Sequence, residues 1–270
     1  MAIRPRLAAL AAGTLSSGLL LAGTAWLAPA ATAADPAADP AGCTRSAIPG
    51  GGDHIVCTQS LGPDDVVTGT GQGDFIEITA ELHGLVRGLG GDDTLSVARV
   101  ARGEQSKGRV HGDEGDDEIV VTGQGDGGVA GEIDGGAGDD TVTAGGVAGG
   151  TVRGSDGDDE ITVGRVDDQG AQGAGVEGGA GHDIIRTGPL GGAATPGSVR
   201  GGAGEDVIEA DTTAQPLIGA LHGDADDDII RGLNDTVLTL GPQSQVDGGA
   251  GLNTCKADNR LGGTVTNCQG

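Results

Sequence analysis

Eight aspartates recur along the chain, each at the same place in a glycine-rich segment. They are Asp74, Asp93, Asp117, Asp140, Asp159, Asp183, Asp206 and Asp228, and Asn253 takes the corresponding place in a ninth segment. Carboxylates in such a series could bind a hard cation such as Ca²⁺, which takes about 6–8 oxygen ligands. Paired acids such as Asp139 and Asp140 could instead act as a general acid and base. Their recurrence in unit after unit favours the cation.

The spacing of these aspartates shows that the chain is built from repeats. Consecutive members lie 19, 24 and 23 residues apart, then again 19, 24 and 23, and finally 22, and Asn253 follows the last aspartate by 25. The triplet gives two blocks of 66 residues, which we interpret as the duplication of a three-coil unit. Variable loops are then expected on the side away from the aspartate turns. A repeat of this length is typical of solenoids, in which each unit packs against its neighbours.

Aliphatic residues accompany the aspartates in register. The first row, two places before the first glycine of each unit, is Val67, Val86, Val110, Ile133, Val152, Val176, Val199, Leu221 and Val246. The second row, two places after each aspartate, is Ile76, Leu95, Ile119, Val142, Ile161, Ile185, Ile208 and Ile230. Apolar and polar residues alternate around them, as β-strands require. The sequence therefore predicts an all-β parallel β-roll or β-helix solenoid of about nine coils.

The glycine-rich segments resemble the RTX (hemolysin-type) calcium-binding repeat Gly-Gly-x-Gly-x-Asp-x-U-x, where U is a large aliphatic residue and the fold is a parallel β-helix. The closest matches are residues 135–142, 178–185 and 201–208, within a resemblance that covers roughly 67–255. The resemblance implies Ca²⁺ between stacked turns, held by the motif aspartates and by loop carbonyls. The loop glycines concerned are Gly135, Gly138, Gly178, Gly181, Gly201 and Gly204.

The chain also departs from the family pattern. One motif turn occurs per coil, whereas family arrays carry two, so we expect a single column of ions on one edge. The second motif glycine is replaced by Thr70, Leu89, Asp113, Ser155 and Asp224, and the third by Gln72 and Asp226. These replacements predict weaker sites in their units.

Composition and charge restrict both the fold and the partners. Glycine supplies 57 of the 270 residues and aromatic residues only 1%, so a conventional aromatic core is excluded. The net charge of −25 argues against nucleic acid and anionic membranes as partners. Such repulsion opposes compaction unless cations neutralise it. With two ladder aliphatics per coil, we expect the ion-free chain to be largely disordered.

The termini indicate export. Residues 1–33 have the basic start, apolar run and Ala-Thr-Ala ending of a secretory signal peptide. We assign 34–42 to a linker, 43–63 to an N-terminal cap, 64–253 to the repeats and 254–270 to a C-terminal cap. The four cysteines allow three disulfide pairings, and their spacing favours Cys43–Cys57 and Cys255–Cys268. The sequence thus predicts a secreted, extracellular protein without membrane insertion and with disulfide-linked caps.

Two functional classes follow. The first is a monomeric calcium-binding structural or adhesive module, without enzymatic activity, whose partner is an extracellular surface or a glycan. The alternative is a polysaccharide-active enzyme or glycan-binding protein with its site on the loop face. Sugar sites usually contain aromatic platforms, and Phe75 is the one aromatic residue after the signal peptide. An ice-binding solenoid would need a flat threonine ladder, which the sequence lacks in regular register.

Overall fold

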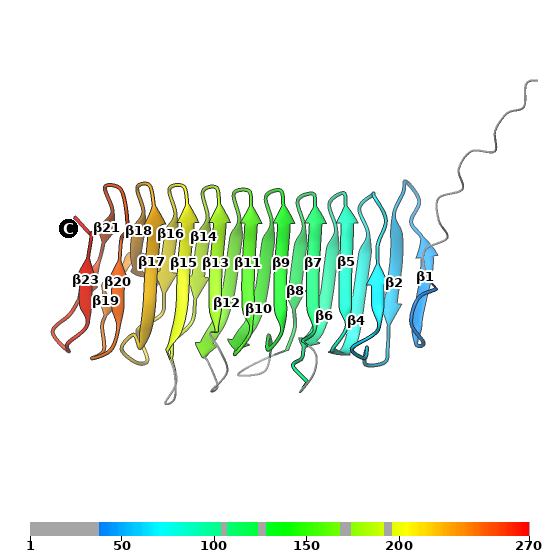
Figure 1. Cartoon of the computed structure of the whole chain (residues 1–270), viewed down its shortest axis with the longest axis horizontal. Helices are drawn as coiled ribbons and strands as arrows, with labels where there is room; N and C mark the ends of the chain where they lie inside the picture. The colour runs from blue at the N-terminus through cyan, green and yellow to red at the C-terminus, as the bar shows by residue number, and fades with distance from the viewer. Residues whose placement is uncertain (1–37, 104–106, 124–127, 168–173, 192–195, 270) are drawn as a thin grey trace, which may run out of the picture. The chain divides into compact units, whose positions relative to one another are not determined.

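The computed structural model describes residues 38–103, 107–123, 128–167, 174–191 and 196–269. These residues form a parallel β-solenoid of about nine coils, which confirms the fold class expected from the repeats (Figure 1). In this part of the chain no helix has the length and apolar character needed to cross a membrane.

Each coil contributes one strand to each of two sheets. Sheet A contains β1 (Cys43–Ala47), β2 (Asp53–Cys57), β4 (Phe75–Leu82), β6 (Thr94–Val100), β8 (Glu118–Val121), β10 (Thr141–Ala148), β12 (Glu160–Asp167), β14 (Ile184–Thr187), β16 (Val207–Ala210), β18 (Ile229–Gly232) and β21 (Thr254–Cys255). Sheet B contains β3 (Val66–Thr68), β5 (Leu85–Gly90), β7 (Arg109–Glu114), β9 (Glu132–Ala137), β11 (Thr151–Asp156), β13 (Gly175–Ala180), β15 (Gly197–Ala203), β17 (Gly219–Ala225), β20 (Gln245–Asp247) and β23 (Thr264–Thr266).

Near the C-terminus, β19 (Leu238–Thr239) pairs with β22 (Ala257–Asp258), and η1 (Leu233–Asp235) is a short 3-10 helix. Among the strand pairs of the described residues, β1 with β2 is antiparallel and the others are parallel.

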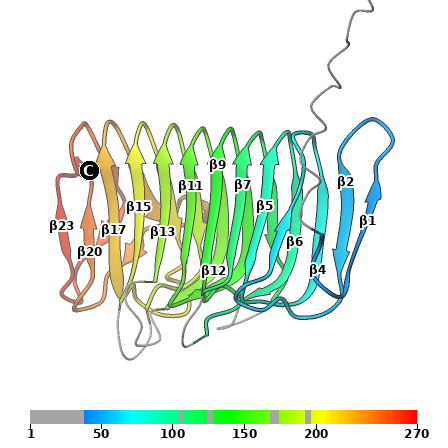
Figure 2. The ribbon, with the colours of Figure 1, turned by 45° about the vertical axis from the view of Figure 1, so that its right-hand side comes forward.

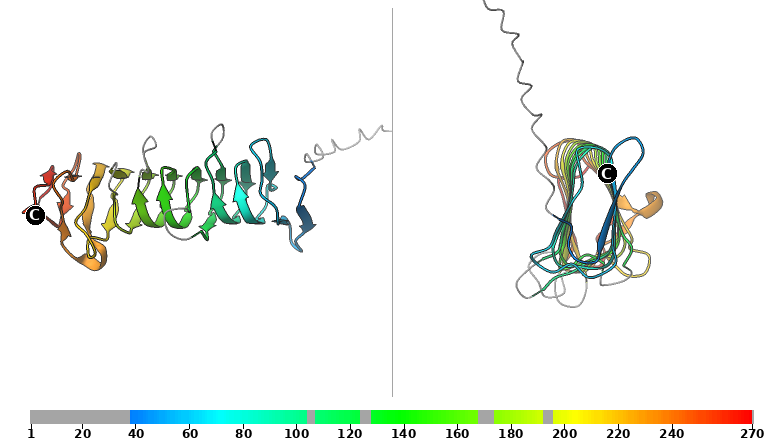
Figure 3. Two further views of the ribbon diagram at one scale, coloured as in Figure 1. Left: turned by 90° about the horizontal axis from the view of Figure 1, so that it is seen from below. Right: turned by 90° about the vertical axis from the view of Figure 1, so that its right-hand side faces the viewer.

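The glycine-rich motifs form one edge of the solenoid. Each motif turn leads from a strand of sheet B into the next strand of sheet A, and these turns make the upper edge in Figure 1. Figure 2 shows the strands of sheet B side by side in front of sheet A, and the end-on view shows the two sheets enclosing a narrow interior (Figure 3, right). The motif turns superimpose closely in that view, whereas the connections on the opposite edge differ from coil to coil.

The interior confirms both predicted aliphatic rows. Members of the first row are 0–1% exposed, and members of the second row are fully buried. Each row is in register across its sheet, as in the pairing of Val152 with Ile133 and Val176 and of Ile161 with Val142 and Ile185.

The core also contains residues that the two rows leave out. Leu82, Val100, Val129, Val147 and Val166 are buried near the opposite edge, and Ile78, Val97, Val121 and Val163 are buried along sheet A. Each buried aliphatic side chain contributes about 1.5–3 kcal/mol. The apolar interior is therefore larger than the two residues per coil expected from the sequence, and apolar burial alone is a weaker reason for disorder without ions.

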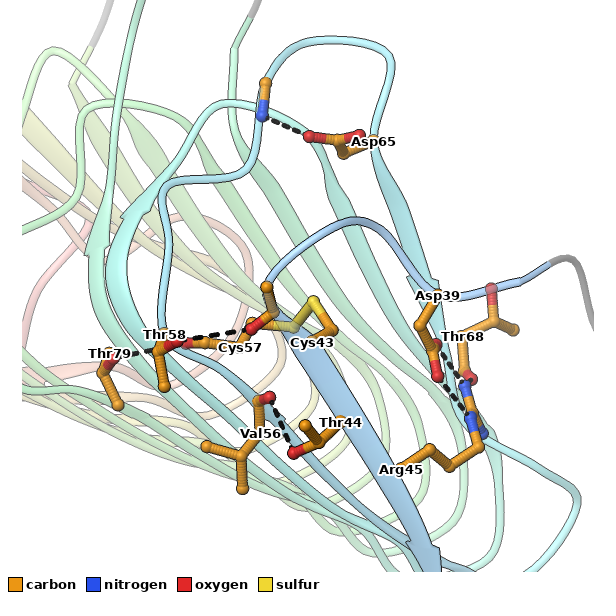
Figure 4. Close-up of a disulfide and its surroundings, with 12 residues drawn as sticks. Asp39, Cys43, Thr44, Arg45, Val56, Cys57, Thr58, Asp65, Thr68 and Thr79 are labelled. Atoms are coloured by element: carbon orange, nitrogen blue, oxygen red, sulfur yellow. Dashed lines mark hydrogen bonds and ion pairs between the residues drawn. A yellow bond between two sulfur atoms is a disulfide. The ribbon is translucent and has the colours of Figure 1, made fainter.

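Disulfides fasten both ends of the solenoid. Cys43 is bonded to Cys57 and Cys255 to Cys268, as the cysteine spacing favoured. The first bond ties β1 to β2 (Figure 4). Such bonds form and persist in oxidising compartments, which agrees with an extracellular location. Residues 1–33, interpreted as a signal peptide, lie outside the described residues.

Arg45 connects the N-terminal cap to the first coil. Its guanidinium donates to Asp39 at 2.7 and 2.8 Å (Figure 4). It also donates to Asp53 at 2.6 Å and to the carbonyl of Thr68 at 2.6 Å. The bond to Thr68 covers part of the free edge of β3, so the cap closes an end that would otherwise offer unpaired backbone groups.

Candidate metal centre

The structure places all eight predicted aspartates at equivalent positions in the motif turns. Each side chain points into the turn, and each residue is 0–3% exposed. Asn253 occupies the ninth position and is fully buried. Buried carboxylates of this kind are rare unless hydrogen bonds or a counter-charge compensate for lost water.

One oxygen of each carboxylate is compensated by the neighbouring coil. The Oδ1 atom accepts a hydrogen bond from the backbone N–H of the equivalent residue in the preceding coil. The distances are 2.6 Å from Asp74 to Asp93, 2.8 Å from Asp93 to Asp117, 2.8 Å from Asp117 to Asp140, 2.8 Å from Asp140 to Asp159, 2.9 Å from Asp159 to Asp183, 2.9 Å from Asp183 to Asp206 and 3.0 Å from Asp206 to Asp228. We call this series the inner ladder.

The second oxygen has no such partner in seven of the eight aspartates. The Oδ2 atoms of Asp93, Asp117, Asp140, Asp159, Asp183, Asp206 and Asp228 are buried and accept no hydrogen bond. A buried acceptor without a donor ordinarily costs about 1–3 kcal/mol of folding free energy, and a charged acceptor costs more. A column of such atoms calls for a compensating proton or cation.

A backbone carbonyl approaches the same space. A Cβ atom added to Gly88 would lie 1.9 Å from Asp93 Oδ2 and 2.6 Å from the carbonyl oxygen of Gly112, in the following coil. The same pairing of carboxylate and carbonyl recurs on the inner side of Gly112, Gly135, Gly178 and Gly223. Two oxygen acceptors thus converge beside each of these glycines. A cation or a carboxyl proton between them would remove the repulsion between the two oxygens.

This oxygen set fits calcium better than a metal that prefers nitrogen or sulfur. Ca²⁺ takes carboxylate and carbonyl oxygens at about 2.3–2.6 Å in flexible geometry. Within the described residues, no three His, Cys, Asp or Glu side chains are grouped to hold a metal. An ion in the inner ladder would therefore depend on backbone carbonyls for part of its shell, as the motif resemblance implies.

Burial raises the pKa of these seven carboxyls. From an ordinary value of 3.8, the pKa rises to about 8 for Asp159, to about 7 for Asp93, Asp140 and Asp206, and to about 6 for Asp117, Asp183 and Asp228. Desolvation is the main cause, and neighbouring carboxylates add to it, whereas the bond from the preceding backbone N–H opposes it. Without a cation, the ionised ladder is thus electrostatically unfavourable.

The predicted glycines are required for stacking. The first glycines, Gly135, Gly178 and Gly201, face the carboxylates, and a Cβ on them would lie 2.1–2.3 Å from an aspartate Oδ2. The third glycines, Gly138, Gly181 and Gly204, have φ of 126–136°, and a Cβ on them would lie 2.0–2.3 Å from a carbonyl of the preceding coil. Both sets therefore allow neighbouring turns to approach closely.

Substituting Gly138 tests this role. Gly138→Ala should lower the free energy of unfolding in calcium by about 2–4 kcal/mol, because the new Cβ meets the Gly115 carbonyl and φ is 130°. Gly71→Ala is the matched control, since a Cβ there has nothing within 4 Å. Chemical denaturation monitored by circular dichroism measures both. Equal stability of the two variants would contradict the close stacking.

The replaced second glycines adopt the conformation of the glycines they replace, with one exception. Leu89, Asp113, Ser155 and Asp224 have φ of 79–94°, a region that non-glycine residues rarely adopt. Arg87 binds Asp113 at 2.7 Å and Arg200 binds Asp224 at 3.1 Å, which helps hold two of them. Thr70 is not among the residues with positive φ.

A second row of carboxylates on the outside of the turns was not identified from the sequence. Here each carboxylate accepts the N–H of the equivalent residue in the following coil, opposite in direction to the inner ladder. The bonds run from Asp116 to Asp92 at 3.2 Å, from Asp139 to Asp116 at 2.9 Å, from Asp158 to Asp139 at 2.9 Å, from His182 to Asp158 at 2.7 Å and from Leu252 to Asp227 at 2.7 Å. We call this series the outer ladder. The recurrent Asp-Asp pairs in the sequence could have indicated it.

The outer ladder makes the turn edge negatively charged. Asp92, Asp116 and Asp139 line an open hollow of about 430 Å³ together with Glu118 and the inner ladder residues Asp93 and Asp117. A surface lined with one sign of charge raises the local concentration of counter-ions. Cations are therefore attracted to the edge where the unpartnered oxygens lie.

Comparisons with protein-family models, with curated proteins and with solved structures found no match to this chain.

Proposed function

We propose that this protein is a secreted calcium-binding β-roll of the RTX type, with Ca²⁺ in a single column between stacked motif turns. The observation that supports this most directly is the set of seven buried Oδ2 atoms without a hydrogen-bond donor. Their burial, their raised pKa values and the carbonyls that face five of them are each accounted for by a divalent cation.

The residues of each site have distinct tasks. The motif aspartate would supply one carboxylate oxygen, while its other oxygen keeps the backbone N–H of the preceding coil, as Asp140 does with Asp117. The first glycine of the following coil would supply a carbonyl oxygen, as Gly154 does beside Asp140. Bound calcium would supply positive charge and a link between successive coils. The outer ladder would draw cations to this edge.

The proposed role is structural or adhesive, at an extracellular surface or on a glycan. Extracellular modules bind calcium at about 10⁻⁴–10⁻³ M. Affinity in this range would leave the chain unloaded where calcium is scarce and loaded outside the cell. Folding would then be completed after export, where the two disulfides also form.

A calcium titration followed by far-ultraviolet circular dichroism tests the proposal. At pH 8, the protein in chelator should show little β-signal and should gain it cooperatively as calcium reaches the millimolar range. Magnesium is the control, because it demands near-ideal octahedral geometry at about 2.0–2.1 Å and retains its water. It should restore little of the signal.

Calorimetric titration with Ca²⁺ supplies the direct binding measurement. Absence of calcium binding at millimolar concentration would overturn the proposal. An identical response to magnesium and calcium would also contradict it, because it would indicate general screening of charge.

A further inference from the structure

The hydrogen bonding of the inner ladder at its two ends differs from that in its interior. At the N-terminal end, Asp74 has both carboxylate oxygens satisfied by the protein. The N–H of Asp53 donates to Oδ1, and Thr70 donates to Oδ2 through its backbone N–H at 2.5 Å and its Oγ1 at 3.1 Å. Asp74 is accordingly absent from the buried atoms that lack a partner.

At the C-terminal end an amide takes the place of the carboxylate. Asn253 Oδ1 accepts the N–H of Asp228 at 2.8 Å and so continues the inner ladder. Its Nδ2 donates to the carbonyl of Asn267 at 3.3 Å. A Cβ added to Gly248 would lie 2.3 Å from that carbonyl, which thus stands where the next glycine carbonyl stands in other coils. The amide N–H therefore occupies the position that a cation would take between two acceptors.

We propose that Thr70 and Asn253 terminate the cation column, so that the protein binds seven Ca²⁺, one for each unpartnered aspartate oxygen. This inference rests on the proposed function and specifies the extent of the same site. A donor from the protein replaces the ion at each end. At Asp74 the carbonyl of Gly88 faces the carboxylate as in the interior coils, so the donors of Thr70 are what distinguish this position.

The conformation of Thr70 explains why the proposed cation column does not extend to Asp74. The four other non-glycine residues at its place in the motif have φ of 79–94°, and Thr70 does not share this conformation. A β-branched side chain is especially unfavourable at positive φ. The backbone N–H of Thr70 instead points at Asp74, and the hydroxyl adds a second donor.

Counting bound ions tests the inference. Native mass spectrometry and equilibrium dialysis with radioactive calcium, at millimolar Ca²⁺, should find seven ions in the wild-type protein. Asn253→Asp should bind one more, because a carboxylate oxygen would then face the Asn267 carbonyl. Thr70→Gly should also bind one more, since glycine permits positive φ and removes the hydroxyl. The double substitution should add two.

Ser155→Gly is the matched control, because Ser155 occupies the place of Thr70 in an interior coil and already has φ of 94°. Its ion count should equal that of the wild type. Circular dichroism in calcium establishes that each variant is folded before ions are counted. The wild-type count and the Thr70→Gly count remain informative even if Asn253→Asp does not fold.

The results separate the two proposals. A wild-type protein that binds no calcium would overturn the proposed function together with this inference. A wild-type protein that binds calcium, with the same count in Asn253→Asp and Thr70→Gly, would overturn this inference alone. Eight or nine ions in the wild type would do so as well, since the end positions would then be occupied.

Discussion

Replacing the seven unpartnered aspartates of the inner ladder by asparagine is expected to give a protein that folds in excess chelator at pH 8. Asn253 shows how this would work, because its Oδ1 keeps the bond from the preceding coil and its Nδ2 donates to the facing carbonyl. Each substitution removes a buried charge and supplies the missing donor. The wild-type protein should be largely unfolded under the same conditions.

The size of the effect follows from the raised pKa values. Even the least shifted carboxyls rise from 3.8 to about 6, so keeping each ionised in the folded state costs about 3 kcal/mol. The seven carboxyls interact, so these costs are not independent, but together they are of the same order as the 5–15 kcal/mol that stabilises a typical domain. Circular dichroism in chelator measures the difference between variant and wild type.

The corresponding sevenfold alanine variant is the control. Alanine also removes the charges, but it leaves the N–H of the preceding coil and the facing carbonyl without partners. It should therefore fold less well in chelator than the asparagine variant. If wild type were as stable in chelator at pH 8 as the asparagine variant, the buried carboxylates would not be the obstacle to ion-free folding.

Acid is expected to stabilise the ion-free protein. The unfolded carboxyls titrate near 3.8, whereas in the folded state they titrate between about 6 and 8. A raised carboxyl pKa means that the folded state binds protons more tightly. The stabilisation is complete below about pH 4 and is lost as the pH rises through 6 to 8. In chelator, the wild-type protein should lack a melting transition at pH 8 and should gain one on acidification, at a temperature that rises towards pH 5.

Thermal melts in chelator across this pH range provide the measurement. The sevenfold asparagine variant should show a much flatter profile, because its amides do not titrate. Calcium should produce a melting transition of the wild type at pH 8 and should have less effect at pH 5, where protons compete for the same oxygens. A melting temperature of the ion-free wild type that falls on acidification would contradict the raised pKa values.

Much of the fold could be predicted because the sequence repeats its constraints. Val152 and Ile161 belong to rows that recur at fixed distances from each motif aspartate, and a solenoid interior is the arrangement that buries both rows at once. The cysteine pairs were identified from proximity in sequence at each end of the array. The burial of every motif aspartate follows from the same register.

Other features depend on the contacts between neighbouring coils, so they cannot be predicted from the sequence of a single repeat unit. The rows that include Val129 and Val147 lie where connection lengths vary, so they have no fixed distance from the motif. The direction of the bonds to Asp92 and Asp139 is set by backbone orientation in the stacked turns. The exceptional hydrogen bonding of Asp74 arises because Thr70 adopts a different φ from its counterparts.

The opposite directions of the two ladders have a consequence for how this chain can grow. In the interior of the array, the buried carboxylate of a coil accepts the N–H of the coil before it, as Asp140 does. Where the outer position is aspartate, its carboxylate accepts the N–H of the coil after it, as Asp139 does. The two faces of a coil are therefore complementary to each other. A gene duplication that inserts whole coils, such as the 66-residue block from Asp74 to Asp140, creates no unfamiliar interface. Length is consequently a heritable variable of this architecture that selection can alter without redesigning the caps.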